Sequence, residues 1–349
     1  MDNIIFALQR AGGISSVWSS VLTGVRNAGA DVRFIEYAGT EANICRSQIE
    51  IGNDEVLLRQ TAGPMRQMMR QRLEVADGEP FIYHSSYYRT CTNPAAVNVT
   101  TVHDFIVDLC ASPFDAKGRL RAYLNRRAIG NSRHLVCVSE NTRNDLLRLM
   151  PDIRANSIQV IHNGISPVFR RLDKCESKYS DCLMFVGGRQ SYKNFEFAVR
   201  AVQGTPFRLL ICGKPLTSAE RRLLTRCLGA DMFVEKVFPS DEDLNRYYNQ
   251  AMALIYPSTY EGFGLPVVEA QAAGCPVIAL AASAIPEVAG DCPTLMSTLT
   301  LKAFNSKLQL VVSPGARERL IEDGIANSRR FRAADMQRRY TEFYQSLQP

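Results

Sequence analysis

Tyr256-Pro-Ser-Thr-Tyr-Glu-Gly-Phe-Gly-Leu-Pro-Val-Val-Glu-Ala-Gln-Ala-Ala-Gly-Cys-Pro-Val-Ile-Ala279 is the stretch of sequence that best indicates the fold. The apolar residues that lead up to Tyr256 predict a buried strand, and a loop with two glycines follows it. Pro266 favours the first turn of a helix and Gly274 its end, because proline fits helix starts and glycine fits just past helix ends. The next apolar run predicts a second strand, so the stretch indicates a parallel α/β sheet.

Two carboxylates lie where this strand ends and the helix begins. Glu261 is in the loop, and Glu269 is on the second turn of the expected helix. The intervening Gly262-Phe263-Gly264 leaves backbone N–H groups free at the start of the helix, which suits hydroxyl-rich or anionic ligands. The alternative is an ordinary strand–turn–helix with two solvated glutamates, and the spacing alone does not decide between them.

Length and composition indicate a globular protein of two domains. A chain of 349 residues is longer than one ordinary core supports, and 46% hydrophobic and 22% charged residues are typical of globular proteins. No apolar run reaches the roughly 18–20 residues of a membrane span. The N-terminus lacks the basic start and long apolar core of a signal peptide. The ten cysteines form no C-x-x-C pair, so we expect a reducing cytoplasm without disulfides or a zinc site.

Short apolar runs alternate with amphipathic stretches along the chain, as in parallel sheets covered by helices. In the first half the expected strands are Ile4–Leu8, Val32–Tyr37, Phe81–His84, Val97–Val102, Leu135–Ser139 and Ile158–His162. In the second half they are Leu183–Val186, Arg208–Cys212, Met232–Val237, Ala253–Tyr256 and Val277–Leu280. We expect helices from Gly12-Gly13 to about Asn27, from Glu140 to just before Pro151, and over Ala333–Leu347. The charged residues 166–181 are typical of a linker.

A second motif, Gly187-Gly188-Arg189-Gln190-Ser191-Tyr192-Lys193-Asn194, follows another expected strand. Its arginine and lysine are expected at the start of a helix, beside backbone N–H groups, which suits a diphosphate. Because basic residues at a helix N-terminus oppose the helix dipole, the placement favours a binding function over a solvated basic surface.

Glycines and polar residues also follow strands in the first half. Gly12-Gly13 follows the first expected strand. It does not match the dinucleotide-binding pattern G-x-G-x-x-G, which argues against a nicotinamide dehydrogenase. His103-Asp104 lies at the end of the expected strand Val97–Val102, where a lone histidine is more often structural than catalytic. Ser139 suits a helix N-cap, and Asn163-Gly164 suits a turn.

The run from Tyr256 to Asp291 resembles the donor-binding motif of retaining glycosyltransferases of family 4, which have the GT-B fold. The resemblance includes Ser283-Ala-Ile-Pro-Glu-Val-Ala-Gly-Asp291, covers most of the chain and is weakest over residues 46–89. It implies two Rossmann-like α/β domains that face a central cleft. Residues 1–168 would form the acceptor-side domain and residues 169–328 the nucleotide-sugar domain. A C-terminal helix, residues 329–349, would cross back onto the first domain.

The resemblance implies roles for residues of the second domain. Arg189 and Lys193 match the family's basic pair, which stabilises the departing diphosphate. Glu261 would hold hexose hydroxyls, and Glu269 would hold the ribose, since a carboxylate accepts two hydrogen bonds from a diol. The other donor-binding residues implied are Gly188, Val237 (near the base), Gly262, Phe263, Gly264 and Leu265.

The resemblance also implies roles in the first domain. His103 matches the histidine that faces the donor sugar, and Gly12 and Gly13 match the glycine pair over the donor phosphates, although the usual continuation is changed to Ile14-Ser15-Ser16-Val17. Asn163 is a further donor-binding candidate. Candidates for acceptor contacts are Asp104, Tyr87, Tyr88 and Arg143; the two tyrosines lie in the region where acceptor specificity usually resides.

The implied reaction needs neither a metal nor a cofactor. The sequence offers no obvious nucleophile for double displacement like that of retaining glycosidases, so the resemblance favours same-face attack in a site that closes and excludes water. The chain looks most like bacterial surface-polysaccharide mannosyltransferases, which makes GDP-mannose the first donor to consider and a UDP-hexose the second. The alternatives are a GT-B nucleotide-sugar epimerase or hydrolase, or a non-catalytic nucleotide- or carbohydrate-binding subunit. The first would need extra acid–base carboxylates and would consume donor without acceptor.

Two basic stretches, Arg59–Arg72 and Lys117–Arg133, contain no acidic residue, and the whole chain carries a net charge of +6. A solvated helix face is the commoner explanation. Docking on an anionic membrane is the alternative, which would suit a lipid-linked acceptor and a protein peripheral to the inner face of the cell membrane. The modest charge and the missing recognition motif argue against nucleic acid as a partner.

Overall fold

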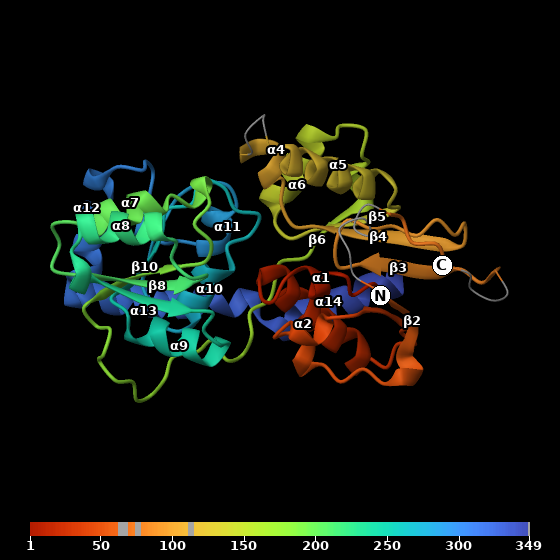
Figure 1. The fold of residues 1–349 in the computed structure, drawn as a ribbon, viewed down its shortest axis with the longest axis horizontal. Helices are drawn as coiled ribbons and strands as arrows, with labels where there is room; N and C mark the ends of the chain where they lie inside the picture. Colours follow the sequence, from red (N-terminus) through yellow and green to blue (C-terminus); the bar gives the residue numbers. More distant parts are fainter. Residues whose placement is uncertain (62–68, 74–77, 111–114, 348–349) are drawn as a thin grey trace. The chain divides into compact units, whose positions relative to one another are not determined.

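The computed structural model describes residues 1–61, 69–73, 78–110 and 115–347. The chain forms two compact units, which are described separately (Figure 1). Unit 1 consists of Met1–Gly164 with Ala333–Pro349, and unit 2 consists of Ile165–Arg332. Both contain parallel strands flanked by helices, so the expected pair of parallel α/β domains is confirmed.

Unit 1 contains two parallel sheets. One pairs β1 (Phe34–Tyr37) with β2 (Val56–Gln60), and the other has the order β3 (Phe81–Ser85), β4 (Ala96–Val102), β5 (His134–Cys137), β6 (Ile158–Val160). A single residue, Asp2, bridges Ile35 on one side and Ser85 on the other and so links the two sheets. The helices are α1 (Ile5–Leu8), α2 (Gly13–Asn27), α4 (Ile106–Cys110), α5 (Ala116–Gly130), α6 (Glu140–Leu149) and α14 (Ala333–Ser346).

The predicted first strand, Ile4–Leu8, is wrong. The chain turns helical at Ile4, where φ is −57° and ψ is −29°. The carboxylate of Asp2 accepts a hydrogen bond from the Ile4 amide at 3.2 Å, and Ser86 Oγ accepts one from the Ile5 amide at 2.9 Å. These side chains take up the backbone donors that a continuing strand would have paired, because strand and turn compete for the same N–H groups.

Helix α14 returns the chain to unit 1 and packs on α2. Gln337 donates to Ser20 Oγ at 3.0 Å, and a Cβ at Gly24 would lie only 2.6 Å from Gln337 Cβ, so glycine permits the close approach of the two helices. Farther along α14, Tyr340 and Tyr344 hydrogen-bond to Thr101 and His84, which lie on β4 and β3.

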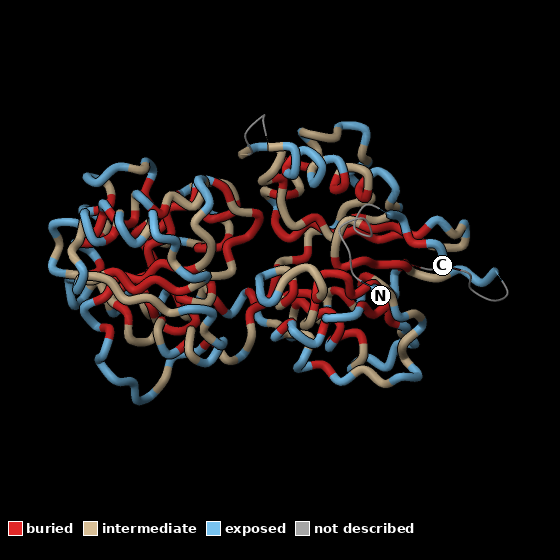
Figure 2. The backbone as a smooth tube through the Cα atoms, viewed as in Figure 1, coloured by how far each residue is buried: buried red, intermediate tan, exposed pale blue. Residues whose placement is uncertain are grey.

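Unit 2 contains a parallel sheet in the order β12-β11-β10-β7-β8-β9. Its strands are β7 (Cys182–Val186), β8 (Arg208–Gly213), β9 (Phe233–Val237), β10 (Ala253–Tyr256), β11 (Val277–Leu280) and β12 (Leu295–Met296). Its helices are α7 (Phe195–Val202), α8 (Ser218–Cys227), α9 (Asp241–Gln250), α10 (Leu265–Ala272), α11 (Ile285–Ala289), α12 (Leu301–Val312) and α13 (Pro314–Ser328). Every residue of β7, β10 and β11 is buried (Figure 2), because α7, α8 and α12 cover one face and α9, α10 and α13 the other.

The strand order of unit 2 reverses between its two central strands. From β7 the chain proceeds outward through β8 and β9, then returns to β10 and proceeds outward on the other side through β11 and β12. The loops that leave β7 and β10 at their carboxyl ends therefore diverge, and open parallel sheets bind ligands at such a switch point. The two motifs singled out from the sequence, residues 187–194 and 257–264, are these two loops.

Candidate active site

Lys193 and Glu261 come together from the two loops at the switch point. The ammonium lies 2.5 Å from Glu261 Oε1 and 3.3 Å from the Tyr256 hydroxyl. It also lies over the rings of Tyr192 and Tyr256, at 5.4 and 5.3 Å from their centroids. Both charged side chains are largely buried, with 14% and 12% of their surface exposed. Lys193, which is expected to bind the diphosphate, and Glu261, which is expected to bind the hexose, are thus in direct contact.

Arg189 is held from several sides and keeps one end unbonded. Its side chain is 6% exposed. Nε donates to Glu220 Oε1 at 2.7 Å, and Nη2 donates to the carbonyls of Pro215 at 2.7 Å and Lys214 at 3.0 Å. Nη1 is buried and has no hydrogen-bond partner among the described residues. A buried donor of this kind is costly unless something else, such as a ligand, supplies the acceptor.

The prediction that Arg189 and Lys193 begin a helix is wrong. Lys193 closes a short 3-10 turn, Ser191–Lys193, and α7 begins only at Phe195. Asn194 lies between this turn and α7 and has a left-handed backbone, at φ 50°. Its side-chain amide donates to the carbonyls of Tyr192 and Pro257. The asparagine therefore ties the loop after β7 to the loop after β10, and the two basic residues lie in the loop itself.

Glu269 lies on the second turn of α10, as the sequence predicts. Its Oε2 accepts a hydrogen bond from the Tyr248 hydroxyl, on α9, at 3.1 Å. Burial, together with the negative charge of Asp241, raises the pKa of Glu269 to about 8, although the bond from Tyr248 acts in the opposite direction. This carboxyl is therefore poised to gain a partner that favours its ionised form, such as a diol or another pair of hydrogen-bond donors.

The raised pKa of Glu269 predicts that the contribution of this carboxyl to stability falls with rising pH. The native state keeps a proton that the unfolded chain releases near pH 4.5, so this contribution is lost as the pH rises from about 5 to 8. Glu269→Gln should remove this part of the slope, whereas Glu196→Gln, on an exposed side chain of α7, should leave it unchanged. Urea unfolding at pH 5, 6.5 and 8 measures the effect. Equal slopes for Glu269→Gln and the unsubstituted protein would contradict the assignment.

The glycine loop positions the start of α10. Gly264 has a left-handed backbone, at φ 99°, and a Cβ there would lie 2.6 Å from Ile285 Cδ1. Phe263 is buried with its ring edge-on to Phe331 at 5.4 Å, and the Glu261 amide donates to Ser283 Oγ at 2.7 Å. Gly264 thus makes the tight connection from this loop to Leu265, the first residue of α10.

The remaining donor candidates of unit 2 lie at the carboxyl ends of β7 and β9. Gly188 follows β7. Val237 is the last residue of β9, with 48% of its surface exposed, and the next residue, Phe238, has a left-handed backbone at φ 44° and is 38% exposed. Two adjacent apolar side chains therefore face solvent at the carboxyl end of β9, where a base could stack.

In unit 1, a helix begins at Gly12-Gly13 as predicted. Gly12 is its N-cap and Gly13 its first residue. The altered continuation has a structural role, since Ser15 is buried and its hydroxyl donates to the Gly12 carbonyl at 3.0 Å while accepting from Gln9. Asn163 is buried, and its Oδ1 has no partner among the described residues.

His103 follows β4 and stays half-buried. Shielding from water lowers its pKa to about 4, so the ring is neutral at pH 7 and can both donate and accept a hydrogen bond. Asp104 accepts from the Ile106 amide at 3.0 Å and so begins α4. Ser139 is the N-cap of α6, accepting from Thr142 at 3.0 Å, and Arg143 pairs loosely with Glu140 at 3.7 Å.

The rings of Tyr87 and Tyr88 are in contact and tilted against each other, with centroids 3.9 Å apart and an interplanar angle of 31°. Burial raises the pKa of both phenols, and the charge of Asp104 acts in the same direction. The structure therefore brings together three of the four residues predicted to contact the acceptor: the two tyrosines and Asp104. Arg143, on α6, pairs with Glu140 instead.

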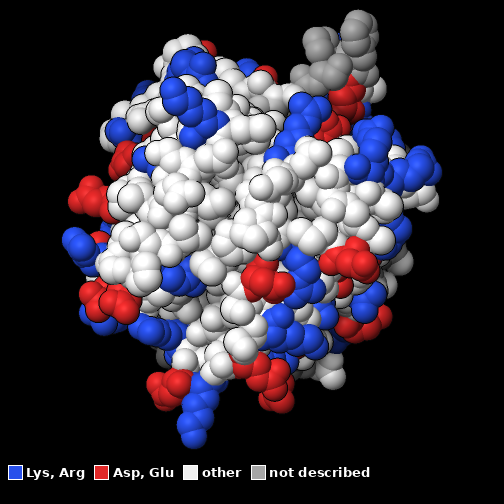
Figure 3. Space-filling model, turned by 90° about the vertical axis from the view of Figure 1, so that its left-hand side faces the viewer, with Lys and Arg blue, Asp and Glu red and all other residues white. Residues whose placement is uncertain are grey.

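The two basic stretches differ in what the structure shows. Much of Arg59–Arg72 lies outside the described residues. Most of Lys117–Arg133 forms α5, which also exposes Leu120 and Tyr123, at 42% and 59%. On the face drawn in Figure 3, basic and acidic side chains are interspersed around a central uncharged area. Within the described ranges, no helix is both long and apolar enough to cross a membrane.

Three residues of the site were missed from the sequence. Glu220 and Tyr248 hold Arg189 and Glu269, and Asp241 acts on Glu269 through its charge. The spacing Thr217-x-x-Glu220 is a capping-box signature that could have drawn attention to Glu220. Asp241-Glu242-Asp243 has the pattern D-x-D, but these residues form the first turn of α9, directly after the N-cap Ser240. Among the described residues, no group of three or more His, Cys, Asp or Glu side chains could hold a metal.

Comparison with known proteins is consistent with this geometry. The model described as Glycosyltransferase Family 4 matches residues 11–169, and the model described as Glycosyl transferases group 1 matches residues 176–324. Over 283 residues the chain is 26% identical to O-antigen chain mannosyltransferase B of Escherichia coli, covering 75% of this chain and 73% of that protein. Matches to three further curated glycosyltransferases span 22%, 46% and 53% of their lengths.

Solved structures show the same fold. Anabaena HepE in complex with UDP and glucose aligns with a TM-score of 0.71 at 16% identity, covering 96% of each chain. WaaG, a glycosyltransferase involved in lipopolysaccharide biosynthesis, aligns with a TM-score of 0.71 at 13% identity, covering 98% of each chain. Together with the two family models, which match consecutive parts of the chain, these likenesses identify a hexosyltransferase. The chain belongs to the glycosyltransferases of family 4 and has the GT-B fold.

Proposed function

We propose that this glycosyltransferase moves a hexose from a nucleotide-diphospho-sugar to a glycan or lipid-linked acceptor, with retention of anomeric configuration and without a metal. Mannose from GDP-mannose is the first choice of donor, supported by the likeness to the O-antigen mannosyltransferase of Escherichia coli. A UDP-hexose is the second, supported by a neighbouring fold that was solved with UDP and glucose.

The observation that carries the proposal is the buried, unpartnered Nη1 of Arg189 at the switch point of unit 2. A phosphate oxygen is the acceptor that fits it, because charge-assisted bonds from guanidinium to phosphate are short and strong. Lys193 is the second cation in the same loop. Its contacts with Glu261 and Tyr256 leave an N–H of the ammonium for another acceptor.

The other residues around the switch point match the remaining parts of a nucleotide-sugar. Glu269 would accept hydrogen bonds from the two ribose hydroxyls, and this contact would draw its raised pKa downward. Glu261 and the loop over Gly262–Leu265 would bind hexose hydroxyls, with the base at Val237. From unit 1, we assign neutral His103 to a hydroxyl of the transferred sugar and Gly12, Gly13 and Asn163 to the donor.

The chemistry follows from where charge develops. The acceptor hydroxyl oxygen forms a bond to the anomeric carbon as the bond from that carbon to the phosphate oxygen breaks. The electron pair of the broken bond remains on that phosphate oxygen, which also takes the proton of the acceptor hydroxyl on the same face of the sugar. Arg189 and Lys193 stabilise the negative charge of the departing diphosphate, and such preorganised charges are usually the largest contribution to catalysis of this kind.

One experiment tests both the identity of the donor and the stereochemistry of sugar transfer. The protein is incubated with GDP-mannose or UDP-glucose and a short synthetic mannoside, and the anomeric configuration of the product is read by NMR. Retention predicts an α-linked product from either α-configured donor. A β-linked product would contradict same-face attack. Release of free sugar at the same rate with and without acceptor would instead indicate a hydrolase.

A further inference from the structure

Glu220 lies outside the loops of the donor site but contacts its central cation. It is on the first turn of α8, and its Oε1 accepts from Arg189 Nε at 2.7 Å. The carboxylate neutralises the net charge of the guanidinium that the proposed diphosphate would need. Its presence beside a phosphate-binding arginine therefore calls for an explanation other than charge.

Glu220 is itself fixed. Its Oε2 accepts from the Thr217 amide at 2.7 Å and from the Thr217 hydroxyl at 2.9 Å, while its own amide donates to Thr217 Oγ1 at 3.2 Å. This is a complete capping box at the start of α8. The carboxylate is therefore held at the start of α8 by its hydrogen bonds to Thr217.

The same segment supplies the other anchors of Arg189. The carbonyls of Lys214 and Pro215, just before the capping box, accept from Nη2, and the ring of Phe195 lies 5.8 Å from the guanidinium carbon. Glu235 on β9 accepts from the Leu216 amide at 2.6 Å and holds the segment to the sheet. Anchors on Nε and Nη2 leave Nη1 as the buried end of the guanidinium that has no hydrogen-bond partner among the described residues.

We infer that Glu220 is a positioning residue, which holds Arg189 so that Nη1 alone is offered to the diphosphate of the donor. The inference rests on the proposed function. The direction in which Glu220→Gln changes diphosphate affinity distinguishes three possible roles of Glu220. Glu220→Gln weakens diphosphate binding if Glu220 positions Arg189, strengthens it if Glu220 only reduces the positive charge, and leaves it unchanged if Glu220 only caps α8.

The test compares nucleotide diphosphates with monophosphates by calorimetry. Glutamine still completes a capping box, so the variant keeps α8 while losing the charged bond to Nε. We expect the affinity of Glu220→Gln for GDP or UDP, whichever the unsubstituted protein binds, to fall about tenfold. Affinity for the corresponding monophosphate should change little. Glu196→Gln, an exposed glutamate on α7, is the matched control.

A second variant tests whether the effect passes through Arg189. In an Arg189→Met background, Glu220→Gln should cause no further loss of diphosphate affinity, because the group it positions is gone. An additional loss in that background, or unchanged or stronger diphosphate binding by Glu220→Gln alone, overturns the inference while leaving the proposed function intact. If the unsubstituted protein binds neither nucleotide, the proposed function is wrong and the inference falls with it.

Discussion

Replacing Lys193 with methionine is expected to lower the rate of sugar transfer by about 10²–10³-fold, as the loss of one preorganised donor does at other sites of developing charge. Methionine keeps an unbranched chain against the rings of Tyr192 and Tyr256, so the contacts of the stem survive. The ammonium is lost, and with it the stabilisation of the departing diphosphate. Glu261 also loses its 2.5 Å partner.

The kinetic pattern distinguishes this role from simple binding. A cation that acts mainly on the leaving group lowers kcat more than it raises KM for the donor. Lys302→Met, on an exposed lysine of α12, is the control with the same chemical change. A Lys193→Met protein with an unchanged melting temperature and a transfer rate close to that of the control would contradict the assignment of Lys193.

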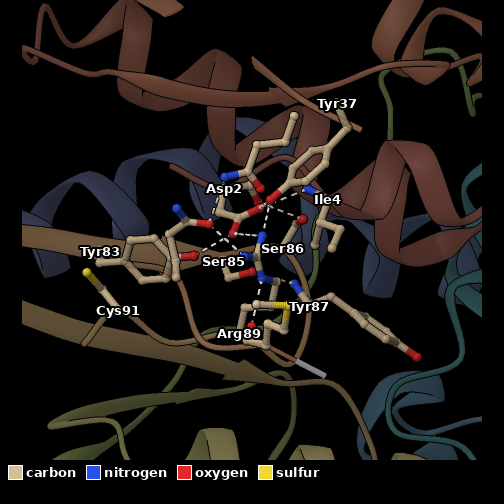
Figure 4. Close-up of polar contacts among 12 residues, drawn as sticks. Asp2, Ile4, Tyr37, Tyr83, Ser85, Ser86, Tyr87, Arg89 and Cys91 are labelled. Atoms are coloured by element: carbon tan, nitrogen blue, oxygen red, sulfur yellow. Dashed lines mark hydrogen bonds and ion pairs between the residues drawn. The ribbon is translucent and has the colours of Figure 1, made fainter. Parts of the chain in front are cut away.

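The largest effect on stability is expected at the buried ion pair of unit 1. Replacing Arg89 with leucine should cost about 3–5 kcal/mol, because it leaves the carboxylate of Asp2 buried without its cation. The two side chains are 2% and 0% exposed, and Arg89 Nη1 lies 3.0 Å from Asp2 Oδ2 (Figure 4). The hydroxyls of Tyr37 and Tyr83 also donate to this carboxylate.

Two further variants control this prediction. Arg33→Leu removes an exposed arginine of the same unit, whose partner Asp31 is 85% exposed, and should change stability by less than about 1 kcal/mol. Asp2→Asn combined with Arg89→Leu should recover part of the loss, since no uncompensated charge remains. Urea unfolding measures all three. A loss at Arg89→Leu no larger than at Arg33→Leu would show that the pair does not hold unit 1 together.

This network also explains the main failure of prediction from the sequence. Ile4–Leu8 has the apolar run of a strand, but the place in the sheet is taken by Asp2, whose bridges and bonds reach residues 35, 37, 83, 85 and 89. Local pattern cannot reveal partners so distant in sequence. By contrast, β7, β10 and β11 are continuous apolar runs, and their positions could be predicted to within two residues.

For a similar reason, some residues of the candidate site could be predicted from the sequence and others could not. Glu269 on the second turn of α10 and Gly13 at the start of α2 follow from short-range rules for glycine, proline and helix ends. The partners of Arg189 do not, because Glu220 lies 31 residues farther along the chain and meets it only through the packing of the loop before α8. The helical start expected at Arg189 failed because the left-handed Asn194 delays α7.

The most direct test of a nucleotide-sugar site in unit 2 is thermal unfolding against UDP, GDP, ADP and their sugars. A ligand at about 100 times its Kd stabilises the native state by about 2.7 kcal/mol, which corresponds to a rise in melting temperature of about 5–10 °C for a unit of this size. We expect such a rise with one nucleotide family and its loss in Glu269→Ala. No shift with any of these ligands, or an equal shift in Glu269→Ala, would contradict the account.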